Sequence, residues 1–445
     1  MIKLLYIFLQ FIILLIIASW AINNSKQVSF IFSDVTVTTS TSVLIIGMLI
    51  IIITSLFLQR FIFFIKQSKQ KYKFYRELAN YEKGHDSFIK GMVALVNKDF
   101  KSVIFEAKNT NKFLKNKSLS LLLTSETLKI EKKYEQLNNV YEEMLKNPNT
   151  NLLALRGLME QNLRAQDYHH AFIYGEKLFN LNPKIDKLYE TLVNIIGKTS
   201  NWQKLIFLSE QSFKYGVIDK NTLSENKSIA FFEIAKIKHQ SYEQESINLM
   251  EKAIKLKNNF PPFICFYIEL LINNNKLEKA KKILKKTWSY IPHPELKLTI
   301  NLLAKKLKIS YLELAKFVCS NTAHHHETQI LLSECYIEEK NWQEARYQIK
   351  PLLEHKPSKQ VCLLMAKIEE GDNGDPNKIN AWISRSNLGK LSKIWVCQIS
   401  GTPQVYWSSV SKEGYFNTLE WKYPKNISEL QSSEFEMNSI KYINN

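Results

Sequence analysis

The run His324-His325-His326-Glu327 is the one obvious cluster of metal-binding side chains in the sequence. Imidazoles and carboxylates bind transition metals and haem iron, so this run is the first candidate for chemistry. Consecutive residues of a helix point about 100° apart, however, and adjacent imidazoles converge on one ion only when the backbone is extended. The H-E-x-x-H zinc motif is also absent. We interpret the run as an exposed turn and keep its three histidines as weak alternative contacts for haem or a metal.

Five cysteines are the other candidate ligands, and the closest two are separated by sixteen positions. Without a C-x-x-C pair, neither a structural zinc site nor a disulfide framework is predicted. Only Cys397 stands in a ligand-like place, inside the aromatic-rich stretch 393–424. That stretch resembles a zinc ribbon of the rubredoxin type, with Ser400 at the second ligand position and SKEG (411–414) as the second knuckle. Tetrahedral zinc takes four ligands, so we interpret Cys397 as a lone remnant and predict no metal site.

A ribbon that has lost its metal needs another source of stability. Either its own aromatic side chains fill the core, or the segment docks on the last helical repeat. The aromatic residues that would fill the core are Trp395, Trp407, Phe416 and Trp421.

Motifs of known catalytic folds are missing from the sequence. No G-x-G-x-x-G or G-x-x-x-x-G-K-[ST] stretch is present to cradle phosphates, and no G-x-S-x-G stretch marks a hydrolase nucleophile. Nothing in the sequence places Ser, His and Asp together. We therefore predict that the protein is not an enzyme, and we assign it no catalytic residue and no cofactor.

A ladder of residues, most of them aromatic, indicates the helices on or between which the candidate histidines and most of the cysteines lie. The first four rungs recur every 34 positions, and each ends a short polar phrase such as NKDF or EKKY. A period of this length predicts two-helix units stacked in series, since one unit cannot bury its apolar face alone. The rungs are Phe100, Tyr134, Tyr168, Trp202, Tyr242, Leu277, Tyr311 and Trp342.

Residues at fixed offsets from the rungs fit the same unit. A small residue is expected three places on, where two helices cross closely, and proline fifteen places on, where the second helix stops. This pattern resembles the tetratricopeptide repeat, most clearly in 155–183 and 329–357, although Met159 and Ser333 replace the usual glycine. The small residues are Ala171, Ala280 and Ala345, and the prolines are Pro183, Pro292 and Pro357.

Two uncharged runs near the start, 4–22 and 42–65 if Arg60 is included, are long enough to cross a membrane. A signal peptide is the alternative for the first run, but the run is longer than a signal core and no cleavage site follows. In the loop 23–41, apolar and polar residues alternate on both sides of Ser33 and Asp34. This alternation predicts two short extended segments.

Charges decide the predicted orientation. Six basic residues and no acidic one lie from Arg60 to Arg76, whereas the loop 23–41 holds Lys26 and Asp34. Basic flanks stay on the cytoplasmic side, so the repeats are predicted to face the cytoplasm. The basic stretch from Lys66 to Arg76 is expected to contact anionic lipid headgroups.

The net charge of +18 raises the question of a polyanionic partner. The densest group within the repeats is Lys279, Lys281, Lys282, Lys285 and Lys286. Because apolar residues interleave with these lysines, we interpret them as a solvated helix face, with an acidic or polyanionic partner as the alternative. No nucleic-acid partner is predicted.

A membrane hairpin with the loop KQVSFIFSDVTVTTS, a basic exit and tetratricopeptide-like repeats together resemble the HemY family of bacterial inner-membrane proteins. The resemblance implies a link to late haem (protoporphyrin) biosynthesis and defines no catalytic residue. The same name is used for an unrelated flavin-dependent oxidase, but that enzyme needs a dinucleotide fold, for which this sequence has no fingerprint.

The sequence thus predicts an all-α protein with four parts. They are a membrane hairpin (1–76), a tetratricopeptide-like superhelix (77–370), a degenerate ribbon-like segment (371–424) and a polar tail (425–445). We expect an inner-membrane scaffold that crosses twice and binds other proteins, such as haem-pathway enzymes, on its concave face. The alternatives are direct binding or transfer of haem or porphyrin, and a general envelope assembly factor unrelated to haem.

Overall fold

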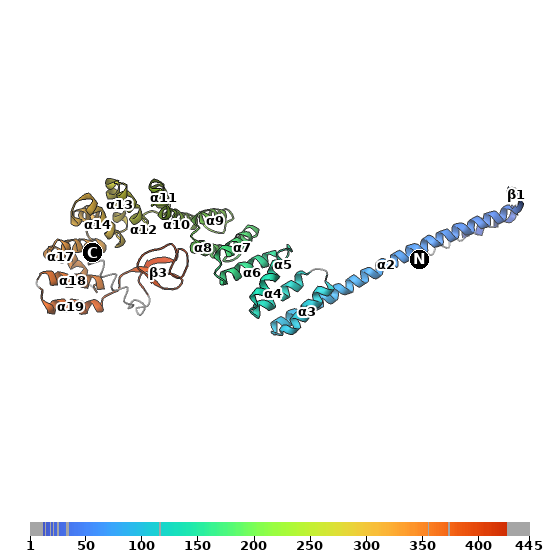
Figure 1. Cartoon of the computed structure of the whole chain (residues 1–445), viewed down its shortest axis with the longest axis horizontal. Helices are drawn as coiled ribbons and strands as arrows, with labels where there is room; N and C mark the ends of the chain where they lie inside the picture. The colour runs from blue at the N-terminus through green and yellow to red at the C-terminus, as the bar shows by residue number, and fades with distance from the viewer. Residues whose placement is uncertain are drawn as a thin grey trace. The chain divides into compact units, whose positions relative to one another are not determined.

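The computed structural model describes residues 12–13, 15–17, 19–20, 22–24, 26–32, 35–114, 117–354, 356–372 and 374–424. The chain divides into two compact units, Met1–Val140 and Tyr141–Asn445. Each unit has a hydrophobic core of its own. The two units are described separately below, and Figure 1 labels their elements. The polar tail 425–445 lies outside the described residues.

The first unit opens with a β-hairpin. Strands β1 (Gln27–Phe32) and β2 (Val35–Ser40) pair antiparallel, with Phe30 opposite Val37. The backbone N–H of Thr41 donates to the Lys26 carbonyl at 2.8 Å and closes the open end. The two extended segments that the alternating residues predict are therefore confirmed.

Helix α2 (Thr41–Val96) follows the hairpin and is 56 residues long, which corresponds to about 84 Å. It contains the predicted span 42–65 and continues without a break through residue 76. Among the described residues it is the one helix long and apolar enough to cross a membrane, with 6% of its most apolar window buried. Of the other predicted span, residues 12–13, 15–17, 19–20 and 22 are helical, and the remainder lies outside the described residues. The basic side chains from Lys66 to Arg76 are exposed on α2.

The last turns of α2 form the first helix of a pair. They pack on α3 (Phe100–Phe113) and α4 (Ser118–Ile130) around a small core of Val103, Ala107 and Leu123. A Cβ added to Gly91 would lie 2.8 Å from a methyl carbon of Leu123, so the close approach of the helices requires glycine there. α5 (Tyr134–Met144) begins in this unit and ends in the second.

The second unit is a stack of helix pairs and has a tetratricopeptide-like helical repeat fold. Its first helices are α6 (Asn151–Arg164), α8 (Leu188–Thr199), α10 (Lys220–Lys238), α12 (Pro261–Asn273), α14 (Glu295–Leu307), α16 (His326–Glu338) and α18 (Lys359–Asp372). Its second helices are α7 (Tyr168–Leu181), α9 (Trp202–Lys214), α11 (Glu243–Leu256), α13 (Leu277–Tyr290), α15 (Tyr311–Cys319), α17 (Trp342–Ile349) and α19 (Pro376–Asn387). A 3-10 turn, η1 (Lys350–Leu353), extends α17.

A recurrent turn precedes the second helices. In six of these turns the residue two places before the rung has a φ of 54° to 59°, in the left-handed region. These residues are Lys98, Lys132, Gln166, Ser200, Asn275 and Lys340. In three turns the next side chain, Asp99, Asp167 or Asn341, accepts a hydrogen bond from a backbone N–H of the first helical turn. Seven of the eight rungs are the first residue of a helix, and Tyr242 is instead the N-cap of α11.

The small residues of the repeats lie where paired helices cross. Ala171, Ala280 and Ala345 are all fully buried. The Ser333 hydroxyl on α16 donates to the Ala345 carbonyl on α17 at 3.1 Å, so this serine links the two helices of its pair. Of the prolines, Pro183 and Pro292 lie two residues beyond the ends of α7 and α13, and Pro357 lies beyond η1.

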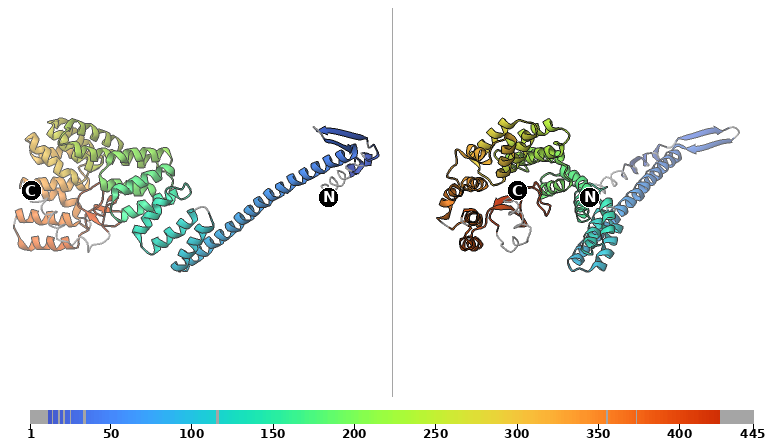
Figure 2. Two further views of the ribbon diagram at one scale, coloured as in Figure 1. Left: turned by 45° about the vertical axis from the view of Figure 1, so that its right-hand side comes forward. Right: turned by 60° about the vertical axis from the view of Figure 1, so that its left-hand side comes forward.

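A three-stranded antiparallel sheet follows α19. Its strand order is β4 (Pro403–Gln404), β3 (Ile394–Cys397), β5 (Leu419–Lys422). The helix pairs of the second unit curve around this sheet, which lies on their inner side (Figures 1 and 2). The prediction of a mostly helical body is confirmed, with the β1–β2 hairpin and this three-stranded sheet as its two small sheets.

Candidate functional site

The inner side of the helix pairs is the surface on which repeat proteins of this kind offer side chains to a ligand. Here residues 394–424, called the C-terminal segment below, lie against it. Their contacts fall on four successive pairs, from α8 to α14. The repeat residues that carry these contacts are Asn194, Trp202, Phe232, Phe260, Phe263, His293 and Glu295.

Trp407 is the centre of this contact. Its ring centroid lies 5.6 Å from that of Phe232, 5.0 Å from Phe260 and 5.7 Å from Phe263, in edge-to-face arrangements. Phe232 stacks on Phe263 at 4.7 Å, so α10 and α12 supply one continuous aromatic surface. Trp407 is 8% exposed, and burial of a side chain this large makes it the main apolar anchor of the segment.

A second contact lies at the α8 and α9 end. The backbone N–H of Phe416 donates to the Asn194 side-chain oxygen at 2.9 Å, across 222 positions of sequence. The Phe416 ring lies 6.2 Å from that of Trp202. A Cβ on Gly197 would lie 3.0 Å from a methyl carbon of Val410, so this glycine permits close approach of the segment to α8.

A third contact buries two titratable groups near the start of α14. The indole N–H of Trp395 and the backbone N–H of Trp407 donate to the Glu295 carboxyl. Burial raises the pKa of Glu295 to about 7 despite these hydrogen bonds. The His293 ring lies 4.4 Å from that of Trp421, and burial lowers its pKa to about 4. The imidazole is therefore neutral at physiological pH.

These contacts change the interpretation of the C-terminal aromatic residues. Trp395 and Trp407 are both buried, and their rings contact phenylalanine rings of the repeats. Of the two alternatives for this segment, docking on the last repeat is not what these contacts show, since they fall on α8 to α14. The phenylalanine rings on α10 and at the start of α12 explain this position, because Trp407 covers their apolar surface and removes it from water.

A hydrogen-bonded polar cluster lies at the ribbon's ligand-like positions. Burial alone would raise the pKa of the Cys397 thiol, but hydrogen bonds from Ser400 and Thr418 lower it to about 7. Burial likewise opposes ionisation of Glu413, but hydrogen bonds from Thr402, Ser411 and Ser400 lower its pKa. Across the described residues no three metal-binding side chains lie together. The hydrogen bonds of Cys397 and Glu413 therefore link the loop at Ser400 to the loop at Ser411 and to Thr418.

The histidine run lies in the turn before α16 and at its start. His325 is the N-cap, and its Nδ1 accepts from the Glu327 backbone N–H at 3.2 Å. His326 Nδ1 lies 3.6 Å from the Glu327 carboxylate. All three histidines are exposed. The run is thus an exposed helix start, in which at least one imidazole has a structural partner.

Sequence reasoning missed the residues that receive the C-terminal segment. Glu295 and Asn194 lack a local signal, because their partners are 100 and 222 positions away. The aromatic receptor did leave a trace: Phe232, Phe260 and Phe263 fall on or beside two successive first helices. Aromatic residues on the face that should bind a ligand indicate an apolar occupant.

Comparison with known proteins gives partial likenesses. No model of a known protein family matches the chain. The probable magnetosome protein Mms48 of Magnetospirillum gryphiswaldense is 22% identical over 178 residues, which are 39% of this chain and 40% of that protein. The chain thus spans less than half the length of this relative.

Three solved structures are partly similar to the chain. The Naa15/Naa10 complex bound to HypK-THB has a TM-score of 0.40 at 12% identity, over 69% of this chain and 53% of that chain. The TPR2AB domain of yeast Sti1 in complex with pHSP90 has 0.29 at 9%, over 69% and 99%. The MamA protein has 0.21 at 10%, over 50% and 91%.

Proposed function

We propose that the protein is a membrane-anchored scaffold whose helix pairs bind partner proteins. The observation that carries the proposal is the stack of helix pairs in a chain that also holds the long apolar helix α2. Repeat stacks present extended surfaces, and an anchor raises the local concentration of whatever binds there. Affinity purification of the full chain from detergent-solubilised membranes tests this, and failure to recover any protein in stoichiometric amount contradicts it.

The proposal assigns partner binding to surfaces that the C-terminal segment leaves open. Between α8 and α14 the inner face is occupied by the chain itself, so a partner would first have to displace Trp407 from its aromatic pocket. This revises the simpler expectation of an empty concave face. Cross-linking of a recovered partner, followed by mapping of the linked lysines, distinguishes the inner face from the outer one.

The pathway we propose is late haem biosynthesis. The support is the resemblance of the membrane hairpin, its loop and the basic exit to the HemY family. A scaffold there would bring late enzymes together or keep a poorly soluble porphyrin near them. Deletion of the gene followed by measurement of porphyrin intermediates is the test. An unchanged porphyrin profile favours the alternative, a general envelope assembly factor.

We further propose that the repeats lie in the cytoplasm, anchored by two spans in the bacterial inner membrane. The excess of basic residues from Arg60 to Arg76 supports this orientation, and their exposure on α2 leaves them free to contact anionic headgroups. A reporter enzyme that is active only in the cytoplasm should be active when it is fused after residue 424. Activity of a periplasmic reporter at the same position would overturn the orientation.

The alternative hypothesis is that the protein binds haem or porphyrin directly. An absorbance titration of the full chain with haem measures it, using a variant with His324, His325 and His326 replaced by alanine. A saturable band shift that the triple variant loses supports tetrapyrrole binding. Identical titrations of both proteins exclude the histidine run as the haem ligand.

A further inference from the structure

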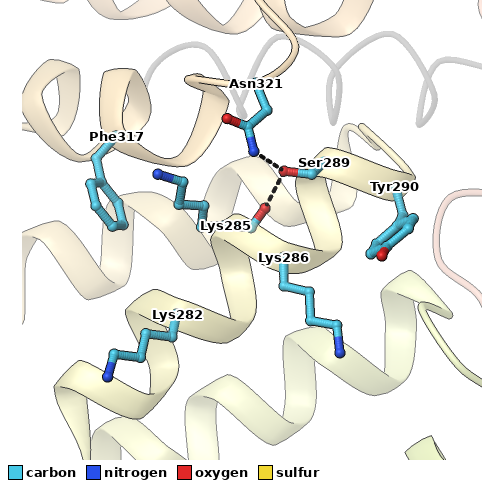
Figure 3. Close-up of a pocket in the computed structure, with 7 residues that line it drawn as sticks. All are labelled: Lys282, Lys285, Lys286, Ser289, Tyr290, Phe317 and Asn321. Atoms are coloured by element: carbon cyan, nitrogen blue, oxygen red, sulfur yellow. Dashed lines mark hydrogen bonds between the residues drawn. The ribbon is translucent and has the colours of Figure 1, made fainter.

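A lysine-rich surface on the second helices of two neighbouring pairs is the feature that the proposed function does not yet use. A shallow cavity of about 340 Å³ lies between α13 and α15, and Figure 3 shows it in close-up. We call it the lysine groove. It is lined by Lys282, Lys285, Lys286, Ser289, Tyr290, Phe317 and Asn321.

Packing of α13 explains why its lysines face outward. Ala280, Leu284 and Trp288 are fully buried on one side of the helix. The indole N–H of Trp288 donates to the Thr328 hydroxyl at 2.9 Å, which fixes the rotation of α13 relative to α16. With that side buried, Lys282 and Lys286 are directed to solvent.

Part of the groove is held in place by its own contacts. The ammonium groups of Lys281 and Lys285 lie 4.4 Å and 4.5 Å from the centroid of the Phe317 ring. The Asn321 amide donates to the Ser289 hydroxyl, which donates to the Lys285 carbonyl, as the dashed lines in Figure 3 show. The ammonium groups of Lys285 in the groove and of Lys281 beside it are therefore positioned on an aromatic ring of the next pair.

Several lysines elsewhere in the stack have carboxylate partners on a neighbouring pair. Examples are Lys204 with Glu176 at 2.7 Å, Lys279 with Glu251 at 2.8 Å, and Lys297 with Glu334 at 3.0 Å. In the part of the chain that the structure describes, the ion pairs include none made by Lys281, Lys282, Lys285 or Lys286.

Two carboxylates lie close in sequence to the groove. Glu278 precedes Lys282 by one helical turn, and Glu313 precedes Phe317 by one turn. Among the described residues, neither carboxylate forms an ion pair with the four lysines. Four like charges within two helical turns repel one another, so binding of an anionic ligand would be favoured there.

We propose that the lysine groove binds an extended acidic segment of a partner protein, with Asp or Glu at alternate positions. Lys282 and Lys286 are separated by about 6 Å along the helix axis, and so are Lys281 and Lys285. Alternate side chains of an extended peptide are separated by about 6.6 Å, which nearly matches this spacing. Tyr290 and Phe317 line the same groove beside the cations. This inference rests on the scaffold function and names the chemistry of one partner.

The test uses the full chain in nanodiscs of uncharged phosphatidylcholine and a fluorescein-labelled peptide with glutamate at alternate positions. Anisotropy should show saturable binding that weakens as salt rises from about 0.05 to about 0.3 M, because the charges are exposed. The double variant Lys282→Glu, Lys286→Glu should raise the Kd by at least about tenfold.

A matched control is available on α11, which is also a second helix. Lys252 and Lys255 are exposed there, and Lys252 lies 5.9 Å from the Phe231 ring centroid. The variant Lys252→Glu, Lys255→Glu changes the net charge by the same amount and should alter the Kd by less than about twofold. Circular dichroism of both variants confirms that their helix content is unchanged.

Three results would overturn the inference. The peptide fails to bind at low salt, or both double variants weaken it equally, which indicates a non-specific charge effect. In the third, the full chain binds phosphatidylglycerol vesicles but not the peptide, and only the groove variant loses this binding, so that the groove is a lipid site. If purification still recovers partner proteins in these cases, the scaffold function stands and only the groove assignment fails.

Discussion

The inner face from α8 to α14 and the lysine groove on α13 and α15 are built from the same helix pairs, yet they differ in what covers them. The inner face presents phenylalanine rings, and the chain's own Trp407 covers them. The groove presents three lysines, which water can solvate and which form no ion pair with a carboxylate among the described residues. An exposed aromatic surface costs free energy until it is covered, whereas lysines do not require cover. The comparison teaches that the open binding surface of a repeat stack depends on side-chain chemistry as well as on curvature.

The largest expected effect comes from removing the anchor of the inner face. Trp407→Ala should reduce the free energy of unfolding by about 3 to 5 kcal/mol, because it leaves a large cavity among Phe232, Phe260 and Phe263. It should also expose the C-terminal segment to protease. The adjacent Tyr406 is 58% exposed, and Tyr406→Ala should cost less than about 1 kcal/mol. Equal losses in the two variants, measured by denaturation, would remove the distinction between the covered and open surfaces.

The next prediction concerns the buried carboxyl of Glu295. Its pKa is about 7 when folded, against an ordinary value of 4.5. As pH rises from about 4.5 to about 7, the unfolded chain releases a proton that the folded chain keeps, so this group lowers stability over that window. Glu295→Gln keeps an acceptor for Trp395 and removes this loss.

Relative to the native protein, Glu295→Gln should therefore gain stability with rising pH, by roughly 3 kcal/mol once pH exceeds about 7. His293 has the opposite shift, but it is present in both proteins and cancels in the difference. Unfolding free energies measured at about pH 5 and about pH 8 decide the matter. A difference that does not change with pH would show that the inner face leaves Glu295 hydrated.

A smaller effect is expected at the other end of the segment. Asn194→Ala removes the acceptor of the Phe416 N–H and should cost about 1 to 2 kcal/mol. The loss should appear locally, as roughly tenfold faster hydrogen exchange of that amide. Exchange at Trp407 should change less, since its aromatic contacts remain. Uniform acceleration across the segment would mean that it opens as one unit.

The smallest effect is expected in the groove. Phe317→Ala removes the ring beneath Lys281 and Lys285, but the ring is 37% exposed and the contacts lie at the surface. The change in unfolding free energy should stay within about 1 kcal/mol. A thermal unfolding midpoint that falls as far as in Trp407→Ala would show that the groove is part of the core instead of an open surface.

The sequence predicted local features of the fold well, because those features depend on neighbouring residues. The rungs mark where helices begin, since a left-handed residue such as Lys98 and a capping residue such as Asp99 precede the helix directly. The continuity of α2 beyond the apolar run was also accessible, because residues 60–83 contain no proline or glycine. The domain boundary predicted after residue 76 falls within this helix.

The candidate site was predicted less well, because its contacts join distant parts of the chain. Cys397 drew attention as a ligand position, whereas the structure gives it hydrogen-bond partners, Ser400 and Thr418. The histidine run drew attention for its composition, and His325 proved to be a helix cap. Composition identifies side chains that could do chemistry, but only their neighbours determine whether they are available.

By itself, the sequence determined the helix pairs, the long apolar helix and the position of each turn, because hydrogen bonds within a few residues and a repeating apolar pattern encode them. Tertiary structure alone decided that the C-terminal segment lies against the inner face between α8 and α14. It also decided that four lysines of α13 form no ion pair with the carboxylates of the described residues. Both outcomes depend on contacts between residues far apart in the sequence, such as the hydrogen bond from the Phe416 backbone N–H to the Asn194 side chain, and a local sequence pattern does not encode such contacts.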